Sequence, residues 1–241
     1  MTMEDTLTGT LAPAQAALWQ SYLAAEAWGL RTETLAALRA FVDALQAGPT
    51  EQRQLFAAEF CRLAADEGAE LPRREPLFAG ILAPYLLAAY DRGDDHAGRR
   101  LAFFWNGFYK LPQSHPLHQP TPSSLDLLRE AFQQNPADAR TQEMLLRLLQ
   151  DSFDYAIHEA PAGVLYGFDG ATVAECQKWE ADLALFREVA EAHGITAQYK
   201  AAMHKWAFHF HGYADYLTNR ADYKNYADYI ERHWQAEHEV S

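Results

Sequence analysis

Apolar residues recur at steps of three and four positions along most of this sequence, which is the spacing of one face of an α-helix. Leu35, Leu38, Phe41, Val42 and Leu45 give a clear example. No stretch combines sustained apolar–polar alternation with the β-branched residues that favour strands. We therefore expect an all-α protein of about ten helices, arranged as antiparallel helical hairpins because short turns separate the helices.

A proline-rich segment interrupts the helical pattern near the middle of the chain. Its sequence is LPQSHPLHQPTP, with prolines at positions 112, 116, 120 and 122, and such density favours an extended course over a helix. We predict an N-terminal helical half over residues 1–110, a proline-rich connection over 111–122 and a C-terminal helical half over 123–241. The two halves can still pack as one domain, since 241 residues suit either one large helical domain or two smaller ones.

Local signals predict several helix ends. Residues 1–11 are polar and lack a cap, so we expect them to form a loose tail. Pro84 should kink or break the helix around it, because proline removes a backbone donor and clashes with the preceding turn. Two capping boxes mark helix starts in the C-terminal half: Ser123 with Asp126, and Thr172 with Glu175.

Composition and charge exclude several classes of function. Hydrophobic residues make up 49% of the chain, which is enough for a packed core. The formal net charge of -13 repels a phosphate backbone, so we expect no nucleic-acid partner. No apolar run approaches the ~20 residues of a membrane span, and the N-terminus has acidic residues where a signal peptide has basic ones. We therefore expect no membrane association, a cytoplasmic location, and buried reduced thiols at Cys61 and Cys176.

Two segments, one in each predicted half, share a spacing of small and large residues that ends in a proline. The two sets are Ala37, Phe41, Ala44 and Pro49, and Ser124, Leu128, Ala131 and Pro136. This pattern resembles the second helix and exit turn of a tetratricopeptide repeat. The first-helix tryptophan, leucine and glycine of that repeat are replaced by Ser21, Ala24 and Ala25, and no third copy follows. The resemblance implies a right-handed superhelix whose concave surface binds a peptide or protein; a helical bundle is the alternative.

The stretch from Tyr199 to Trp234 is the richest in aromatic residues and histidines. One set of its side chains falls on a single helical stripe, interpreted as the core seam of two antiparallel helices: Tyr199, Met203, Trp206, Phe210, Tyr213 and Leu217. A second stripe beside it contains His204, Phe208, His211 and Asp215. In the last helix Tyr223, Tyr226 and His233 share a tyrosine-lined face. These last seven residues are the candidate site for a ligand or partner.

The histidines of this candidate site allow several chemistries. His211 and Asp215 are one helical turn apart and can share an ion or form an oriented pair. His204 and His211 are roughly 10 Å apart along the helix axis, so a metal ion would need ligands from another helix, such as His233, Glu237 or His238. No phosphate-binding, zinc-protease or serine-hydrolase motif is present in the sequence. We therefore assign no catalytic residue, no metal and no cofactor.

Taken together, these patterns favour a non-catalytic helical module that binds a protein or peptide in an aromatic and histidine-lined groove of the C-terminal half. The acidic composition suggests that the partner can be basic. Two alternatives remain open. The first is an acidic inhibitor of the immunity-protein type that neutralises a basic partner. The second is a helical-bundle enzyme or ligand carrier that binds a metal or cofactor through His204, His211, Asp215 and His233.

Overall fold

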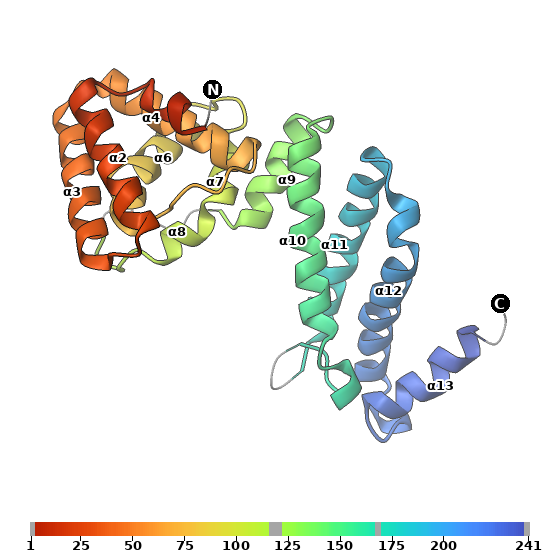
Figure 1. The fold of residues 1–241 in the computed structure, drawn as a ribbon. Coiled ribbons are helices and arrows are strands. Elements are labelled where there is room, and N and C mark those ends of the chain that lie inside the picture. The colour runs from red at the N-terminus through yellow and green to blue at the C-terminus, as the bar shows by residue number, and fades with distance from the viewer. Residues whose placement is uncertain (1–2, 116–121, 167–169, 239–241) are drawn as a thin grey trace. The chain divides into compact units, whose positions relative to one another are not determined.

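The protein is all-helical, as predicted. The computed structural model describes residues 3–115, 122–166 and 170–238, and this part of the chain contains no strand. Its helices connect through short turns, and several of those turns contain a glycine with a positive φ angle, such as Gly29, Gly68 and Gly194. Glycine adopts this left-handed backbone without a Cβ clash and therefore ends helices readily. Figure 1 shows the order of the elements along the chain.

Internal contacts divide the chain into two compact units, here called the N-terminal unit (residues 1–131) and the C-terminal unit (132–241). The division falls within α9 (Ser124–Gln134), nine residues beyond the predicted proline-rich connection over 111–122. Half of that connection, residues 116–121, lies outside the described residues. Its role as the boundary between the two halves stays a prediction.

The N-terminal unit is built mostly from short helices (Figure 1). Antiparallel α2 and α3 form the most extensive helix–helix contact in this unit. The elements are α1 (Met3–Thr8), α2 (Pro13–Ala27), α3 (Arg31–Ala47), α4 (Thr50–Cys61), η1 (Arg62–Asp66), α5 (Glu75–Leu77), η2 (Phe78–Leu82), α6 (Ala83–Asp91), α7 (Ala97–Phe103) and α8 (Trp105–Tyr109).

The core of the N-terminal unit is an aromatic cluster around Trp19. The Trp19 ring lies 5.1 Å from the ring of Phe41 and 5.5 Å from that of Phe56, between centroids. Leu7, on α1, is also fully buried. The prediction of a loose tail over residues 1–11 is therefore wrong for the described part, because α1 gains stability from this burial and needs no cap of its own.

Two helices of the N-terminal unit are irregular, one at the predicted Pro84 and one at a position that was not predicted. Ahead of Pro84, residues 78–82 form the π-helical turn η2, and α6 then begins at Ala83. The helix therefore does not break at Pro84 but contains a π-helical turn just before it, which agrees with the predicted local distortion, because the proline ring cannot fit against the preceding turn of a regular α-helix. A break, which the sequence analysis did not predict, separates α7 from α8 at Phe104, where ψ is 4°.

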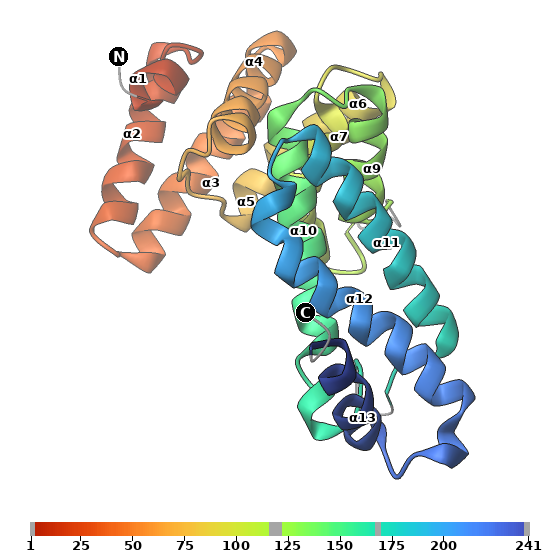
Figure 2. The ribbon, with the colours of Figure 1, turned by 90° about the vertical axis from the view of Figure 1, so that its right-hand side faces the viewer.

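In the C-terminal unit three long helices lie side by side, and α13 packs against one of them (Figure 1 and Figure 2). The elements after α9 are α10 (Ala139–Ile157), η3 (Ala160–Ala162), α11 (Val173–Ala192), α12 (Thr196–Thr218), η4 (Arg220–Asp222) and α13 (Tyr226–His238). The predicted capping box of Thr172 and Glu175 is present at the start of α11.

The stripe predicted as the core seam of α12 is buried at four of its six positions, whereas Tyr199 and Leu217 are half-buried, and it packs mainly on α10 and α11, not only on the last helix as predicted. Met203, Trp206, Phe210 and Tyr213 are buried, and the rings of Trp206 and Phe210 lie 5.1 Å and 5.4 Å from that of Phe153 on α10. These contacts hold α12 against α10 and α11.

Two further expectations can be compared with the structure. Both segments that resemble a tetratricopeptide repeat are helices followed by a turn that contains a proline. This geometry is common to many helical hairpins, so the resemblance stays a prediction. Cys61 and Cys176 are buried free thiols, as expected. Among the helices of the described residues, none has the length and apolar character that a membrane crossing requires.

Candidate functional site

The structure gives different surroundings to the residues of the predicted His204–Asp215 stripe. His204 and His211 are exposed on α12, whereas Phe208 is buried. The Nδ1 atom of His211 lies 3.2 Å from a carboxylate oxygen of Glu180 on α11. Asp215 instead accepts a hydrogen bond of 2.8 Å from the side-chain amide of Asn219. His211 and Asp215 therefore have separate partners, and their proposed pairing finds no support in the geometry.

The tyrosines predicted on the last helix form a compact cluster, although Tyr223 precedes α13 and has an extended backbone conformation. The hydroxyl of Tyr223 lies 3.1 Å from Nε2 of His233, and the His233 ring stacks on Tyr229 with 4.3 Å between centroids. Tyr226 is fully buried, and its ring lies 4.6 Å from that of Tyr213 on α12. The predicted residues Tyr223, Tyr226 and His233 are thus brought close together around Tyr229.

A glycine on α12 permits this close approach of α13. A Cβ atom added at Gly212 would lie 3.0 Å from Cε1 of Tyr229, which is tighter than ordinary van der Waals contact. Because glycine has no side chain, the tyrosines of α13 can pack onto the backbone of α12. The face of α12 that contains Phe208, Gly212 and Tyr216 is therefore buried.

The same packing buries His209, which the sequence analysis did not select. Nδ1 of His209 lies 3.0 Å from the hydroxyl oxygen of Tyr226, and that hydroxyl lies 3.3 Å from the carbonyl oxygen of His209. One arrangement satisfies both contacts: the Tyr226 hydroxyl donates to the carbonyl and accepts from the protonated Nδ1. The tyrosine thus fixes the tautomer and orientation of a neutral imidazole.

Burial also sets the protonation state of His209. Removal from water, and to a smaller extent the positive charge of nearby Lys205, together lower the pKa of the imidazole to about 4. Burial raises the pKa of the Tyr226 hydroxyl as well, so that the phenol keeps its proton. The pair is uncharged at neutral pH and provides hydrogen-bonding groups without a net charge.

His209 lines a cavity of about 600 Å³ in the C-terminal unit, and this cavity is open to solvent. The cavity lies where the end of α10 and the short helix η3 meet α12 and α13. Its apolar walls are Ile157, Ala160 and Ile230, and its polar groups are Asp154, His158, Lys205 and His209. Mostly apolar cavities with a few placed polar groups are typical of binding sites, and this volume lies in the usual range of ~300–1,000 Å³.

Two of the polar groups are fixed by neighbouring side chains. The indole N–H of Trp206 donates to a carboxylate oxygen of Asp154 across 2.9 Å. The ring of His158 stacks on Tyr155 with 4.9 Å between centroids, and its Nε2 lies 3.0 Å from Glu159. Tyr155 and Tyr166 are exposed by 60% and 39%, and their rings are 5.8 Å apart. An exposed aromatic surface therefore adjoins the cavity through His158.

The sequence contains a signal that points to His209. This residue is three positions after Trp206 and four before Tyr213, both of which belong to the predicted core seam. A histidine at core spacing should be buried and hydrogen-bonded. The sequence gives no comparable signal for the lining residues Asp154, Lys205 and Ile230, because they come from separate helices that meet only in the folded protein.

The described side chains offer no metal centre. Within them, no group of three histidine, cysteine or acidic residues is placed to hold a metal ion. The side chains of Glu237 and His238, which the sequence suggested as metal ligands, lie outside the described residues.

Burial raises the pKa of the Cys176 thiol to about 12 and also raises that of Cys61. Both cysteines therefore stay protonated and are poor nucleophiles or ligands.

Comparison of the chain with protein-family models, with curated proteins and with solved structures finds no match.

Proposed function

We propose that this protein is a non-catalytic binding module whose C-terminal unit holds an apolar anchor side chain of a protein or peptide partner. The single observation that carries the proposal is the cavity lined by His209, Lys205 and Ile230. Its volume of about 600 Å³ accommodates a large side chain. Anchor side chains of this kind, placed in a desolvated pocket, supply most of the affinity in many protein interfaces.

The polar groups suit recognition of a neutral partner group better than catalysis. A histidine whose pKa is about 4 is a weak base at neutral pH, whereas general bases work best with a pKa near the operating pH. Among the residues that the structure describes, neither serine nor cysteine lines the cavity. His209 and Asp154 instead offer hydrogen bonds to a polar tip of the anchor, such as the hydroxyl of a tyrosine or the N–H of a tryptophan.

The exposed aromatic surface next to the cavity provides the outer part of the same site. Tyr155 and Tyr166 present ring faces to solvent, and Tyr166 does so from a backbone with φ of 54°, which is uncommon for a residue other than glycine. Such outliers persist where the surrounding structure holds them, often at binding sites. The two tyrosines can cover the part of the partner's backbone that flanks the inserted anchor side chain.

Free buried cysteines are consistent with a reducing, cytoplasmic location.

The proposal is tested by selecting peptides from a displayed random library against the full chain and measuring their affinity by fluorescence anisotropy. In Ile230→Asp a charge enters the apolar wall, and in Lys205→Glu the charge at the cavity reverses. We expect both variants to bind the selected peptides at least tenfold more weakly. The matched control is Lys200→Glu, an exposed lysine on the same helix away from the cavity, which should bind as the wild type does.

Two outcomes would contradict this function: a library that yields no binding peptide, or selected peptides that bind Ile230→Asp and Lys205→Glu with wild-type affinity. Circular dichroism of each variant shows whether its helix content matches that of the wild type.

An acidic inhibitor of a basic partner is the second candidate, supported by the formal net charge of -13. The composition and salt dependence of the selected peptides distinguish this candidate from the proposed function. Selected sequences would then be rich in lysine and arginine, and their affinity would fall steeply between low and high salt because exposed charges are screened.

A further inference from the structure

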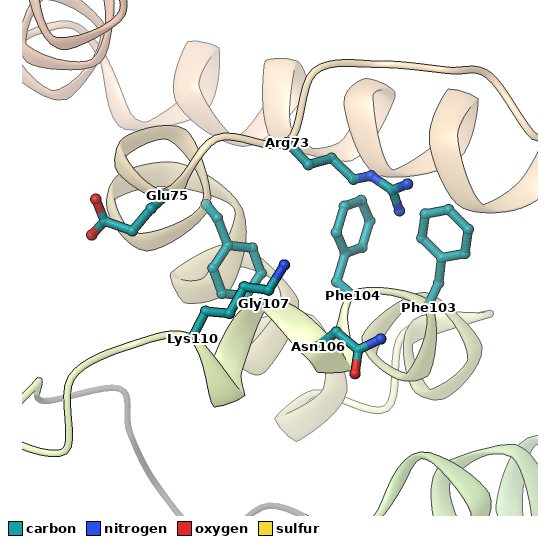
Figure 3. A pocket seen from close by; sticks show the side chains of 8 residues that line it. Arg73, Glu75, Phe103, Phe104, Asn106, Gly107 and Lys110 are labelled. Carbon is teal, nitrogen blue, oxygen red and sulfur yellow. The ribbon is translucent and has the colours of Figure 1, made fainter. Parts of the chain in front are cut away.

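A second hollow, of about 340 Å³, lies in the N-terminal unit and is unrelated to the cavity of the proposed function. Its lining combines three phenylalanines, Phe78, Phe103 and Phe104, with the side chains of Arg73, Asn106 and Lys110. Figure 3 shows that Arg73 enters from the segment before α5, whereas Asn106 and Lys110 come from α8 and its C-terminal end. Two cations from separate segments of the chain therefore line one hollow together with three phenylalanine rings.

These two cations lack acidic partners within the described part of the chain. Other arginines of the same unit are paired: Arg74 with Glu26 at 2.7 Å, and Arg100 with Asp66 at 2.5 Å. Arg73 instead lies over the ring of Phe103, with its guanidinium carbon 4.9 Å from the ring centre. This cation–π contact positions the guanidinium and leaves its N–H donors available.

The aromatic wall of the hollow is preformed. Phe78 and Phe104 are each only 3% exposed, and the ring of Phe78 meets that of Phe108 edge to face at 4.9 Å. Gly107 on α8 makes this arrangement possible, because a Cβ atom there would lie 2.6 Å from the Phe78 ring. A ligand would therefore meet a fixed apolar surface and would lose little affinity to reordering of the protein.

We propose that this hollow binds a small organic monocarboxylate with an apolar body about the size of one ring. Arg73 and Lys110 donate charge-assisted hydrogen bonds to the carboxylate, the phenylalanines contact the apolar body, and the Asn106 amide supplies a further polar contact.

The charge and the size of the hollow both favour this class of ligand. Glu75 also lines the hollow, and in Figure 3 its carboxylate extends away from Arg73 and Lys110. Two cations and one acid leave a single positive charge, which matches one carboxylate and not the double charge of a phosphate monoester. The volume lies near the lower end of the ~300–1,000 Å³ typical of ligand sites, which excludes a nucleotide-sized ligand.

An NMR titration of the ¹⁵N-labelled full chain with 3-phenylpropionate tests the proposal. We expect saturable shifts in the backbone amides around Phe103 and Lys110. Because a hydrogen bond to a charged group contributes more than a neutral one, Arg73→Gln and Lys110→Gln should each weaken binding about tenfold or more. Both side chains are exposed and unpaired among the described residues, so neither substitution removes an ion pair that holds the fold. Arg39→Gln, at an exposed site on α3, is the matched control.

Comparison ligands separate this site from a simple anion site. 3-Phenylpropionamide, which lacks the charge, and acetate, which lacks the ring, should each bind about tenfold or more weakly than 3-phenylpropionate. The proposal is overturned if 3-phenylpropionate does not bind, if inorganic phosphate binds as tightly, or if Arg73→Gln and Lys110→Gln bind it as tightly as Arg39→Gln does. None of these results depends on the cavity in the C-terminal unit.

Discussion

Acidification should destabilise the C-terminal unit through His209. In an unfolded chain a histidine titrates near pH 6.5, whereas burial and the neighbouring Lys205 lower the pKa of folded His209 to about 4. Between these two values the unfolded chain binds a proton that the folded chain does not bind. The free energy of unfolding must therefore fall as the pH falls from about 6.5 to about 4.

The size of this loss follows from the difference between the two pKa values. Each pH unit below 6.5 costs about 1.4 kcal/mol until the folded histidine also titrates. The loss is thus about 2 kcal/mol at pH 5 and about 3 kcal/mol near pH 4. Carboxylates with a lowered pKa, such as Glu59, Glu175 and Asp228, lose their contribution mainly below pH 4.5. A comparison of pH 7.5 with pH 5 therefore leaves most of the carboxylate contribution out, and the difference between the wild type and a His209 variant isolates this histidine from the others.

The assay is urea unfolding followed by circular dichroism at both pH values, in the wild type and in His209→Gln. The glutamine retains a hydrogen-bonding group for Tyr226 but has no titrating proton, so its free energy of unfolding should lose about 2 kcal/mol less on acidification. His204→Gln, an exposed position on the same helix, should respond as the wild type does. Low protein concentrations are needed, because the sequence pI of about 5.1 lies close to the lower pH.

Equal losses in the wild type and in His209→Gln would refute this reasoning. So would an NMR titration in which the His209 ring of the folded protein gains its proton near pH 6.5, since that value would mean that water reaches the imidazole.

Three further predictions concern individual contacts. Lys205→Gln should raise the pKa of His209 but leave it below 6.5, because burial remains the larger cause; NMR titration measures this, and Lys200→Gln should have no effect. Gly107→Ala should lower the free energy of unfolding of the N-terminal unit by about 1–3 kcal/mol, because the new methyl group would overlap the Phe78 ring. Gly98→Ala, whose Cβ would meet nothing nearer than 3.5 Å, should be neutral or stabilising in the same urea experiment. Asp66→Asn should cost about 3–5 kcal/mol, because it breaks the ion pairs of Asp66 with the buried Arg99 and with Arg100. Glu67→Gln, which removes an exposed partner of Arg62, should cost less than about 1 kcal/mol.

Each of these has a result that would contradict it. An unchanged His209 pKa in Lys205→Gln would mean that water screens the lysine. Equal stability of Gly107→Ala and Gly98→Ala would mean that Phe78 can move freely. A small effect of Asp66→Asn would mean that solvent reaches the Arg99 guanidinium.

The sequence alone determines the helical class, most helix positions and the core seam of α12. These features depend on local chemistry: the spacing of Trp206, Phe210 and Tyr213, the capping box at Thr172, and the helix distortion at Pro84. Each acts over one or two helical turns, so each can be read without knowledge of the rest of the fold.

Only the tertiary structure decides which polar residues become a site. The periodicity of α12 assumes one buried stripe, but α13 covers a second face of the helix and buries Phe208 and His209 there. Because α12 packs on two sides, residues that share a stripe along it differ in burial. The predicted stripe therefore combined the buried Phe208 with the exposed His204 and His211 in one candidate site. The cavity itself needs α10, η3, α12 and α13 to meet. That meeting depends on the absence of a side chain at Gly212 and on contacts between distant segments, which the spacing of residues within any one helix does not specify.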